Sequence, residues 1–139
     1  MYVFFVFCSR IGGDRINRLL DAVYDVDIFG LATRHYLGES VWDEVSAAKA
    51  NNKYAAVWYN STEFYPAQKL LSVSNVDEAK SLPGVTYLHV QAEPGDTLSS
   101  MKNSFSRLAL SVATGESADE AIEQAKSSVD SLSFCVTSA

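Results

Sequence analysis

The sequence predicts an α+β fold, with a mixed, mostly antiparallel sheet and helices packed mainly against one face. The chain has 139 residues, 47% of them hydrophobic and 12% aromatic, so we expect one sizeable core and a single domain over residues 1–139. Strand-like segments of the second half do not alternate strictly with helices, which favours antiparallel pairing. In the first half, apolar residues at helical spacing predict helices that bury one face.

The first part of the chain, residues 1–50, is expected to contain a strand, a Gly-Gly turn and helices. Residues 2–7 form a continuous apolar run, which is typical of a strand covered on both faces. The spacing of apolar residues then predicts a helix over residues 14–24, with Asp14 as its N-cap.

A second helix is expected to begin after Asp27, whose side chain can cap it, and to stop at Gly38. Residues 40–50 predict one or two weaker helical turns, and residues 51–53 predict the loop that ends this part of the chain.

The second part, residues 54–139, begins with strand signals. Segments 54–59 and 68–73 are rich in strand-forming residues, and a hairpin is the simplest pairing for them. A short helix over residues 76–81 and a strand over residues 85–90 follow.

Residues 93–96 predict a turn, and the alternation of apolar and small residues over 107–113 predicts a half-buried strand. Ser117 and Glu120 have the spacing of a capping box at the start of a last helix. The buried stripe of this helix is expected to consist of Ile122, Ala125, Val129 and Leu132.

Charge and composition limit the function classes. A formal charge of -6 and a pI near 4.8 argue against a nucleic-acid surface, which needs clustered Lys and Arg. The apolar run at the start is too short to span a membrane and lacks the flanks of a signal peptide. We therefore expect a soluble, cytoplasmic protein whose two cysteines, Cys8 and Cys135, are reduced.

The opening stretch has the layout of an anion site. Arg10, Gly12 and Gly13 stand between an apolar strand and a helix, where a guanidinium and helix N–H groups can hold a carboxylate or phosphate. The alternative is that the glycines only turn the chain and that Arg10 pairs with an acid such as Asp14. The sequence leaves both interpretations open.

Three other groups of residues were weighed as sites. Cys8 is a candidate nucleophile because a nearby cation lowers a thiol pKa, although most free cysteines are simply packed. His35 is expected on a helix face that touches the core, and neither it nor His89 has metal-ligand spacing. The acidic residues of 25–44 could bind a cation, but surface carboxylates are the commoner case; they are Asp25, Asp27, Glu39, Asp43 and Glu44. No metal site and no cofactor are predicted.

Several short pieces, in this order and spacing, together resemble the C-terminal portion of the ATP-grasp ligases, in their biotin-carboxylase-like and amino-acid-ligase branches. The pieces are Arg10-Ile11-Gly12-Gly13, Val26-Asp27-Ile28, Leu37-Gly38-Glu39, Leu82-Pro83-Gly84-Val85, Pro94-Gly95-Asp96, Arg107, Ala113-Thr114-Gly115-Glu116-Ser117 and Glu120-Ala121.

The resemblance implies the fold of that portion, without the ATP-binding lobe that would precede it. It also implies that Arg10, Gly12 and Gly13 face a carboxylate or acyl-phosphate substrate. In these ligases the strand before the arginine supplies a glutamate and an asparagine that hold magnesium. This chain has Val6 and Cys8 at those positions, and a valine has no oxygen ligand to offer.

The resulting hypothesis is a non-catalytic or accessory ATP-grasp-derived domain, which binds a small carboxylate, a separate ligase subunit or a second copy of itself. One alternative is a repurposed enzyme that acts on a small carboxylate without ATP, through Cys8 and Arg10. Another is an excised fragment of an ATP-dependent carboxylate–amine ligase. An autonomous ATP-dependent ligase activity is not expected, because phosphoryl activation needs metal, lysine and a lid.

Overall fold

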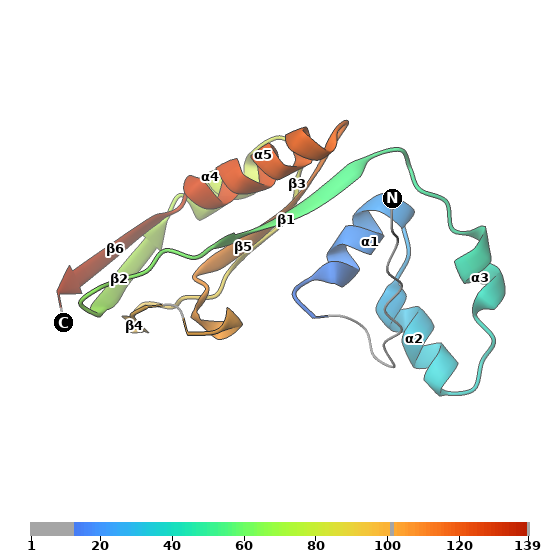
Figure 1. Cartoon of the computed structure of the whole chain (residues 1–139), viewed down its shortest axis with the longest axis horizontal. Helices are drawn as coiled ribbons and strands as arrows, with labels where there is room; N and C mark the ends of the chain where they lie inside the picture. Colours follow the sequence, from blue (N-terminus) through green and yellow to red (C-terminus); the bar gives the residue numbers. More distant parts are fainter. Residues whose placement is uncertain (1–12, 101, 139) are drawn as a thin grey trace, which may run out of the picture. The chain divides into compact units, whose positions relative to one another are not determined.

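The computed structural model of the chain describes residues 13–100 and 102–138, which form two compact units, Met1–Asn51 and Asn52–Ala139 (Figure 1). The strand predicted over residues 2–7 lies outside the described residues. We describe each unit by itself, and the single domain expected from composition stays a prediction. None of the described helices is both long and apolar enough to cross a membrane.

The first unit contains three short helices, α1 (Ile16–Tyr24), α2 (Ile28–Tyr36) and α3 (Trp42–Ala47). The predicted cap of α2 is confirmed, because Asp27 Oδ1 accepts a hydrogen bond from the Gly30 N–H at 3.0 Å. Gly38 follows the end of α2 with a φ of 91°, a left-handed conformation that favours glycine.

The start of α1 differs from the prediction. Asp14 and Arg15 both have left-handed backbones, with φ of 55° and 64°, and the N-cap position falls on Arg15, whose side chain caps nothing. An N-cap side chain needs an extended backbone to reach the free N–H groups, so the prediction of Asp14 as the cap is wrong. The far end of α1 is held by Asn51, which donates from its backbone N–H to the Val23 carbonyl and from Nδ2 to the Ala22 carbonyl, both at 2.9 Å.

The second unit consists of two antiparallel three-stranded sheets and two helices, so the predicted α+β class is confirmed. One sheet has the order β1-β5-β3 and the other the order β4-β2-β6. The elements are β1 (Tyr54–Asn60), β2 (Gln68–Ser74), α4 (Val76–Ser81), β3 (Val85–Val90), β4 (Thr97–Leu98), the 3-10 turn η1 (Ser104–Ser106), β5 (Ala109–Gly115), α5 (Ala118–Asp130) and β6 (Ser133–Ser138).

The predicted hairpin between the first two strands is wrong, since β1 and β2 belong to different sheets. β1 pairs with β5, where Tyr54 lies opposite Gly115, and β2 pairs with β6, where Ser74 lies opposite Ser133. The connection over residues 61–67 is longer than the loops of tight hairpins. β6 has no counterpart among the predicted elements.

β5 is more deeply buried than its alternating sequence suggested. It begins at Ala109, and Ala109 to Ala113 are all buried. The strand is central, with β1 and β3 on its two edges and α5 packed along it, so the prediction of a half-buried strand from residue 107 is wrong.

α5 begins with the predicted capping arrangement. Ser117 Oγ accepts from the Glu120 N–H at 3.2 Å, and the Glu120 carboxylate accepts from the Glu116 N–H at 2.8 Å. The predicted buried stripe is confirmed for Ala125, Val129 and Leu132, which are all buried. It is wrong for Ile122, which is 41% exposed, whereas its smaller neighbour Ala121 is buried.

The two helices cover one face of the β1-β5-β3 sheet (Figure 1). Ser128 Oγ on α5 donates to the Ala79 carbonyl on α4 at 3.0 Å, and Ala79 packs in one cluster with Leu88 of β3 and Ala109 of β5. Strand alternation and register therefore place the other residues of these strands on the opposite face. Two cross-strand rows lie there: Tyr59, Leu110 and His89, and beside them Val57, Val112 and Tyr87.

A second cluster belongs to the β4-β2-β6 sheet. Its buried members are Leu70, Ala92, Leu98 and Leu108. Phe134 of β6 packs against both clusters, so it joins the cores of the two sheets.

Candidate functional site

The anion site predicted at the start of the chain lies almost wholly outside the described residues. Cys8, Arg10 and Gly12 precede the first described residue, so their assignment stays a prediction. Gly13 is described and exposed, and its carbonyl oxygen accepts from the Ile16 N–H at 3.2 Å. No heavy atom of another described residue lies within 4 Å of the point where a Cβ would project from Gly13.

Two of the carboxylates that were candidate cation ligands form hydrogen bonds with an arginine. Arg34 Nε donates to Glu39 Oε2 at 2.8 Å, and its terminal nitrogens donate to the two Glu44 oxygens at 2.6 and 2.9 Å. The hydrogen bonds from Arg34 lower the pKa of Glu44, and those to Glu44 and Glu39 raise the pKa of Arg34. All three side chains remain well exposed, so this fork joins α3 to α2 at the surface and adds little to stability.

The histidines are held by aromatic neighbours. His35 is exposed on α2, where its ring centroid lies 6.1 Å from that of Trp42 and 6.3 Å from that of Tyr36. It therefore contacts surface aromatic rings, whereas the sequence had predicted contact with the core. His89 stacks with Tyr87 at 6.4 Å on β3. Within the described residues, no group of three or more His, Cys, Asp or Glu side chains could hold a metal ion.

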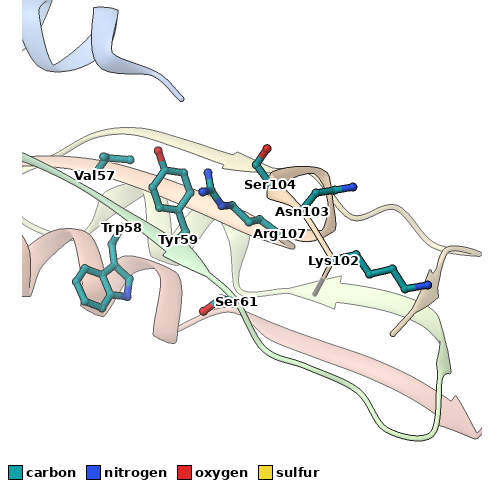
Figure 2. Close-up of a pocket in the computed structure, with 8 residues that line it drawn as sticks. All are labelled: Val57, Trp58, Tyr59, Ser61, Lys102, Asn103, Ser104 and Arg107. Atoms are coloured by element: carbon teal, nitrogen blue, oxygen red, sulfur yellow. The ribbon is translucent and has the colours of Figure 1, made fainter. Parts of the chain in front are cut away.

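A pocket of about 550 Å³ lies beside β1 in the second unit, and it is the strongest candidate site among the described residues. Val57 and Tyr59 project into it from the sheet face opposite α5, whereas Trp58 points to the other side of the strand (Figure 2). The remaining lining residues are Ser61, Lys102, Asn103, Ser104 and Arg107.

The loop that carries Lys102 and Arg107 is organised by its own hydrogen bonds. The Lys102 N–H donates to Ser106 Oγ at 3.3 Å, and the Ser106 N–H donates to the Asn103 carbonyl at 3.0 Å. Directly after Arg107, the Leu108 N–H donates to the Asn60 carbonyl at 3.1 Å, which fixes the end of the loop against β1. The loop thus holds the side chain of Arg107 beside β1.

The electrostatic character of the pocket comes from two cations. Among the described residues that line the pocket, Lys102 and Arg107 are the charged ones and none is a carboxylate. Arg107 Cζ lies 4.0 Å from the centroid of the Tyr59 ring, a cation–π contact that holds the guanidinium beside the ring (Figure 2). The arrangement can bind an anion and offers an apolar wall beside it. Arg107 also borders a second pocket of about 320 Å³ that contains Asp96, whose Oδ2 accepts from the Glu93 N–H at 2.8 Å.

This pocket was not identified from the sequence, where Arg107 served only as one piece of the family resemblance. A weak signal was present, since Arg107 is the only arginine in residues 52–139. Tyr59 and Lys102 carry no motif. Tyr59 comes near Arg107 through the pairing of β1 with β5, whereas Lys102 lies on the same loop as Arg107.

Comparison with known families identifies the second unit. Residues 64–137, more than half of the chain, match the family model of the L-amino acid ligase C-terminal domain 2. The chain belongs to this family. The match to the L-amino acid ligase C-terminal domain 2 includes the loop with Lys102 and Arg107, whereas β1 with Tyr59 precedes it.

Two solved structures share the fold of this family member. An L-amino acid ligase from Bacillus licheniformis matches with a TM-score of 0.74 and 12% identity over 94% of this chain and 33% of that chain. A phosphoribosylglycinamide synthetase from Anaerococcus prevotii matches with a TM-score of 0.72 and 13% identity over 91% of this chain and 31% of that chain. No curated protein matches the sequence significantly.

The chain therefore spans about a third of the length of the solved structures it resembles. The similarity to the C-terminal portion of ATP-grasp ligases, inferred from the sequence, is confirmed.

Proposed function

We propose that this chain is an accessory, C-terminal part of an ATP-grasp ligase, which binds a small carboxylate and acts together with an ATP-binding lobe. The observation that carries the proposal is the fold match over more than nine-tenths of this chain but only a third of each ligase structure. The lobe would be contributed by the same longer polypeptide or by a separate subunit.

The first unit supports this proposal because it buries little of its own apolar surface. Among its described residues, the buried apolar side chains are Leu31 and Val41. Its large apolar side chains that stay exposed are Ile16, Tyr24, Phe29, Tyr36, Leu37, Trp42 and Val45. A helical unit with so small a core gains little from burial and needs a covering surface. We assign that surface to the ATP-binding lobe, since the matched ligases are three times as long as this chain.

The carboxylate is assigned to Arg10, Gly12 and Gly13 on the resemblance given above. The nucleotide is assigned to the lobe, because Val6 and Cys8 replace the oxygen ligands that hold magnesium in these ligases. A triphosphate bound without that metal would keep its charge uncompensated.

Calorimetric titration of the chain with ATP and magnesium tests the assignment of the nucleotide. We expect no saturable heat from the chain alone. Magnesium-dependent binding in the micromolar range would contradict the proposal, because it would place a nucleotide site in this chain.

NMR titration with L-alanine tests the carboxylate assignment. We expect the amide signal of Gly13 to shift, and the shift to disappear in Arg10→Ala. Arg18→Ala is the matched control, because Arg18 lies on α1 and pairs with Asp21 at 3.9 Å. Equal loss in both variants would show a general charge effect and no site at Arg10.

Sedimentation of the chain mixed with an ATP-binding lobe from the same family tests the docking surface. We expect a complex that Trp42→Ser weakens. Leu71→Ser on β2 is the control, because Leu71 is likewise an exposed apolar side chain, 50% exposed, but lies in the second unit. A self-dimer that the lobe does not displace would show that a second copy covers the surface, which would overturn this part of the proposal.

A further inference from the structure

The pocket beside β1 is electropositive in an acidic protein. The chain has a net charge of -6, yet the described residues that line the pocket include Lys102 and Arg107 and no carboxylate. Its volume of about 550 Å³ lies within the range of small-molecule sites. Ser61, Asn103 and Ser104 add hydroxyl and amide groups that can donate to an oxyanion. Charge, size and donors thus agree on an anionic ligand.

The guanidinium of Arg107 is arranged before any ligand arrives. Its cation–π contact with the Tyr59 ring, at 4.0 Å, holds in place a planar group whose forked donors suit carboxylate and phosphate. The loop that carries it is tied to β1 through Leu108 and Asn60, and to the end of β3 through the Gln91 N–H, which donates to the Leu108 carbonyl at 2.8 Å. Ordering this site on binding therefore costs little conformational entropy.

The pocket also has an apolar wall. Val57 and Tyr59 project from β1 on the side of the sheet away from the helices, with Tyr59 directly beside Arg107 and Val57 beyond Tyr59 (Figure 2). A bare inorganic ion would leave this wall in contact with water, whereas a ligand with an apolar or aromatic group would cover it. Lys102, further along the loop, has a flexible side chain that can follow ligands of different length.

We propose that the pocket formed by Val57, Tyr59, Lys102 and Arg107 is a binding site for a small organic oxyanion, a carboxylate or a phosphate monoester, that carries an apolar or aromatic group. The oxyanion binds the Arg107 fork and Lys102, and the apolar group packs on Val57 and the exposed edge of the Tyr59 ring. Its lining residues all belong to the second unit, whereas Arg10 belongs to the first.

The test is an NMR titration of the full chain with benzoate, phenyl phosphate, inorganic phosphate and the neutral benzyl alcohol. We expect saturable shifts for residues 57–61 and 102–107 with benzoate or phenyl phosphate, and dissociation constants of about 1 mM or lower. The stronger of these two probes identifies the oxyanion. Inorganic phosphate is expected to bind more weakly, and benzyl alcohol is not expected to bind.

Variants separate the contributions of charge and ring. Arg107→Ala should weaken binding about tenfold or more, since it removes a charge-assisted contact. Lys102→Ala changes an exposed side chain that the fold does not need and should weaken binding about threefold or more. Tyr59→Leu should weaken the aromatic probes more than inorganic phosphate. Lys126→Ala, an exposed position on α5, is the matched control and should leave the constants unchanged.

Three results would overturn the proposal. The first is the absence of saturable shifts up to about 10 mM probe, well above the expected constant. The second is an equal effect of Lys102→Ala and Lys126→Ala, which would show only non-specific charge attraction. The third is loss of binding in Arg10→Ala with retention in Lys102→Ala, which would place the probe at the opening stretch and would favour the proposed carboxylate site instead.

Discussion

Gly84, in the turn between α4 and β3, should be the glycine of the second unit that least tolerates a side chain. Its φ is 71°, and a Cβ there would overlap the Thr114 carbonyl oxygen of β5 and the end of the Gln124 side chain. The Gln124 side chain can move, but the Thr114 carbonyl is backbone. The Gly84 carbonyl also accepts from the Thr114 N–H at 2.9 Å, which keeps the two segments together.

The matched control is Gly95, in the turn before β4. Its φ is 102°, but within the described part of the chain no heavy atom lies within 4 Å of the point where its Cβ would project. Gly95→Ala therefore adds only the left-handed backbone strain, about 1–2 kcal/mol. Gly84→Ala adds the same strain and an overlap with packed backbone that costs about 1–3 kcal/mol more.

Urea denaturation followed by circular dichroism measures both losses. We expect the free energy of unfolding to fall by about 1–2 kcal/mol in Gly95→Ala and by about 2–5 kcal/mol in Gly84→Ala, with unchanged denaturant slopes. Equal losses in the two variants would refute the reasoning, because they would show that the contact of Gly84 with β5 carries no steric constraint.

Three further predictions concern the core, the surface ion pair and assembly. Leu70→Ala should lower the free energy of unfolding by about 2–5 kcal/mol, because Leu70 is 1% exposed. Its neighbour Leu71 is 50% exposed, so Leu71→Ala should cost less than about 1 kcal/mol in the same urea assay. Because the contact with Arg34 lowers the pKa of Glu44 in the folded state, the stabilisation from this pair is present above the ordinary carboxyl pKa and is lost as the pH falls through the lowered pKa. NMR titration of Arg34→Ala should show a higher titration midpoint for Glu44. An unchanged midpoint would contradict the contact. The apolar run at residues 2–7 predicts self-association of the isolated chain at micromolar concentration, which sedimentation can measure, and a constant mass of 15.2 kDa would count against it.

Elements with local signals could be predicted from the sequence. Asp27 caps α2 and Ser117 caps α5, because a capping side chain and the N–H groups it binds are within three residues of each other. The ranges of β1, β2 and β3 also follow from local composition. The prediction of Asp14 as the N-cap of α1 failed for a local reason as well. The capping pattern considers only the residue type and its spacing, and these do not specify the left-handed backbone of Asp14.

Strand pairing and the pocket could not be predicted, because both depend on contacts between distant segments. Nothing near β1 indicates that its partner is β5, and the sequence of β5 does not reveal that it is flanked on both edges. The pocket could not be predicted for the same reason. Tyr59 and Arg107 meet only after β1 and β5 have paired, so the sequence does not show that the two residues are in contact.

The pairing of β2 with β6 also constrains the order in which the protein can fold during synthesis. Leu70 lies in β2, but β6, which pairs with β2 and supplies Phe134 to the clusters of both sheets, leaves the ribosome only after the other described strands of the second unit. Until then the edge of β2 and one side of each cluster are without their partner, so the nascent second unit is exposed to wrong pairings. Such long-range closure also predicts a slow folding step for the second unit, with its rate set by the docking of β6 on β2.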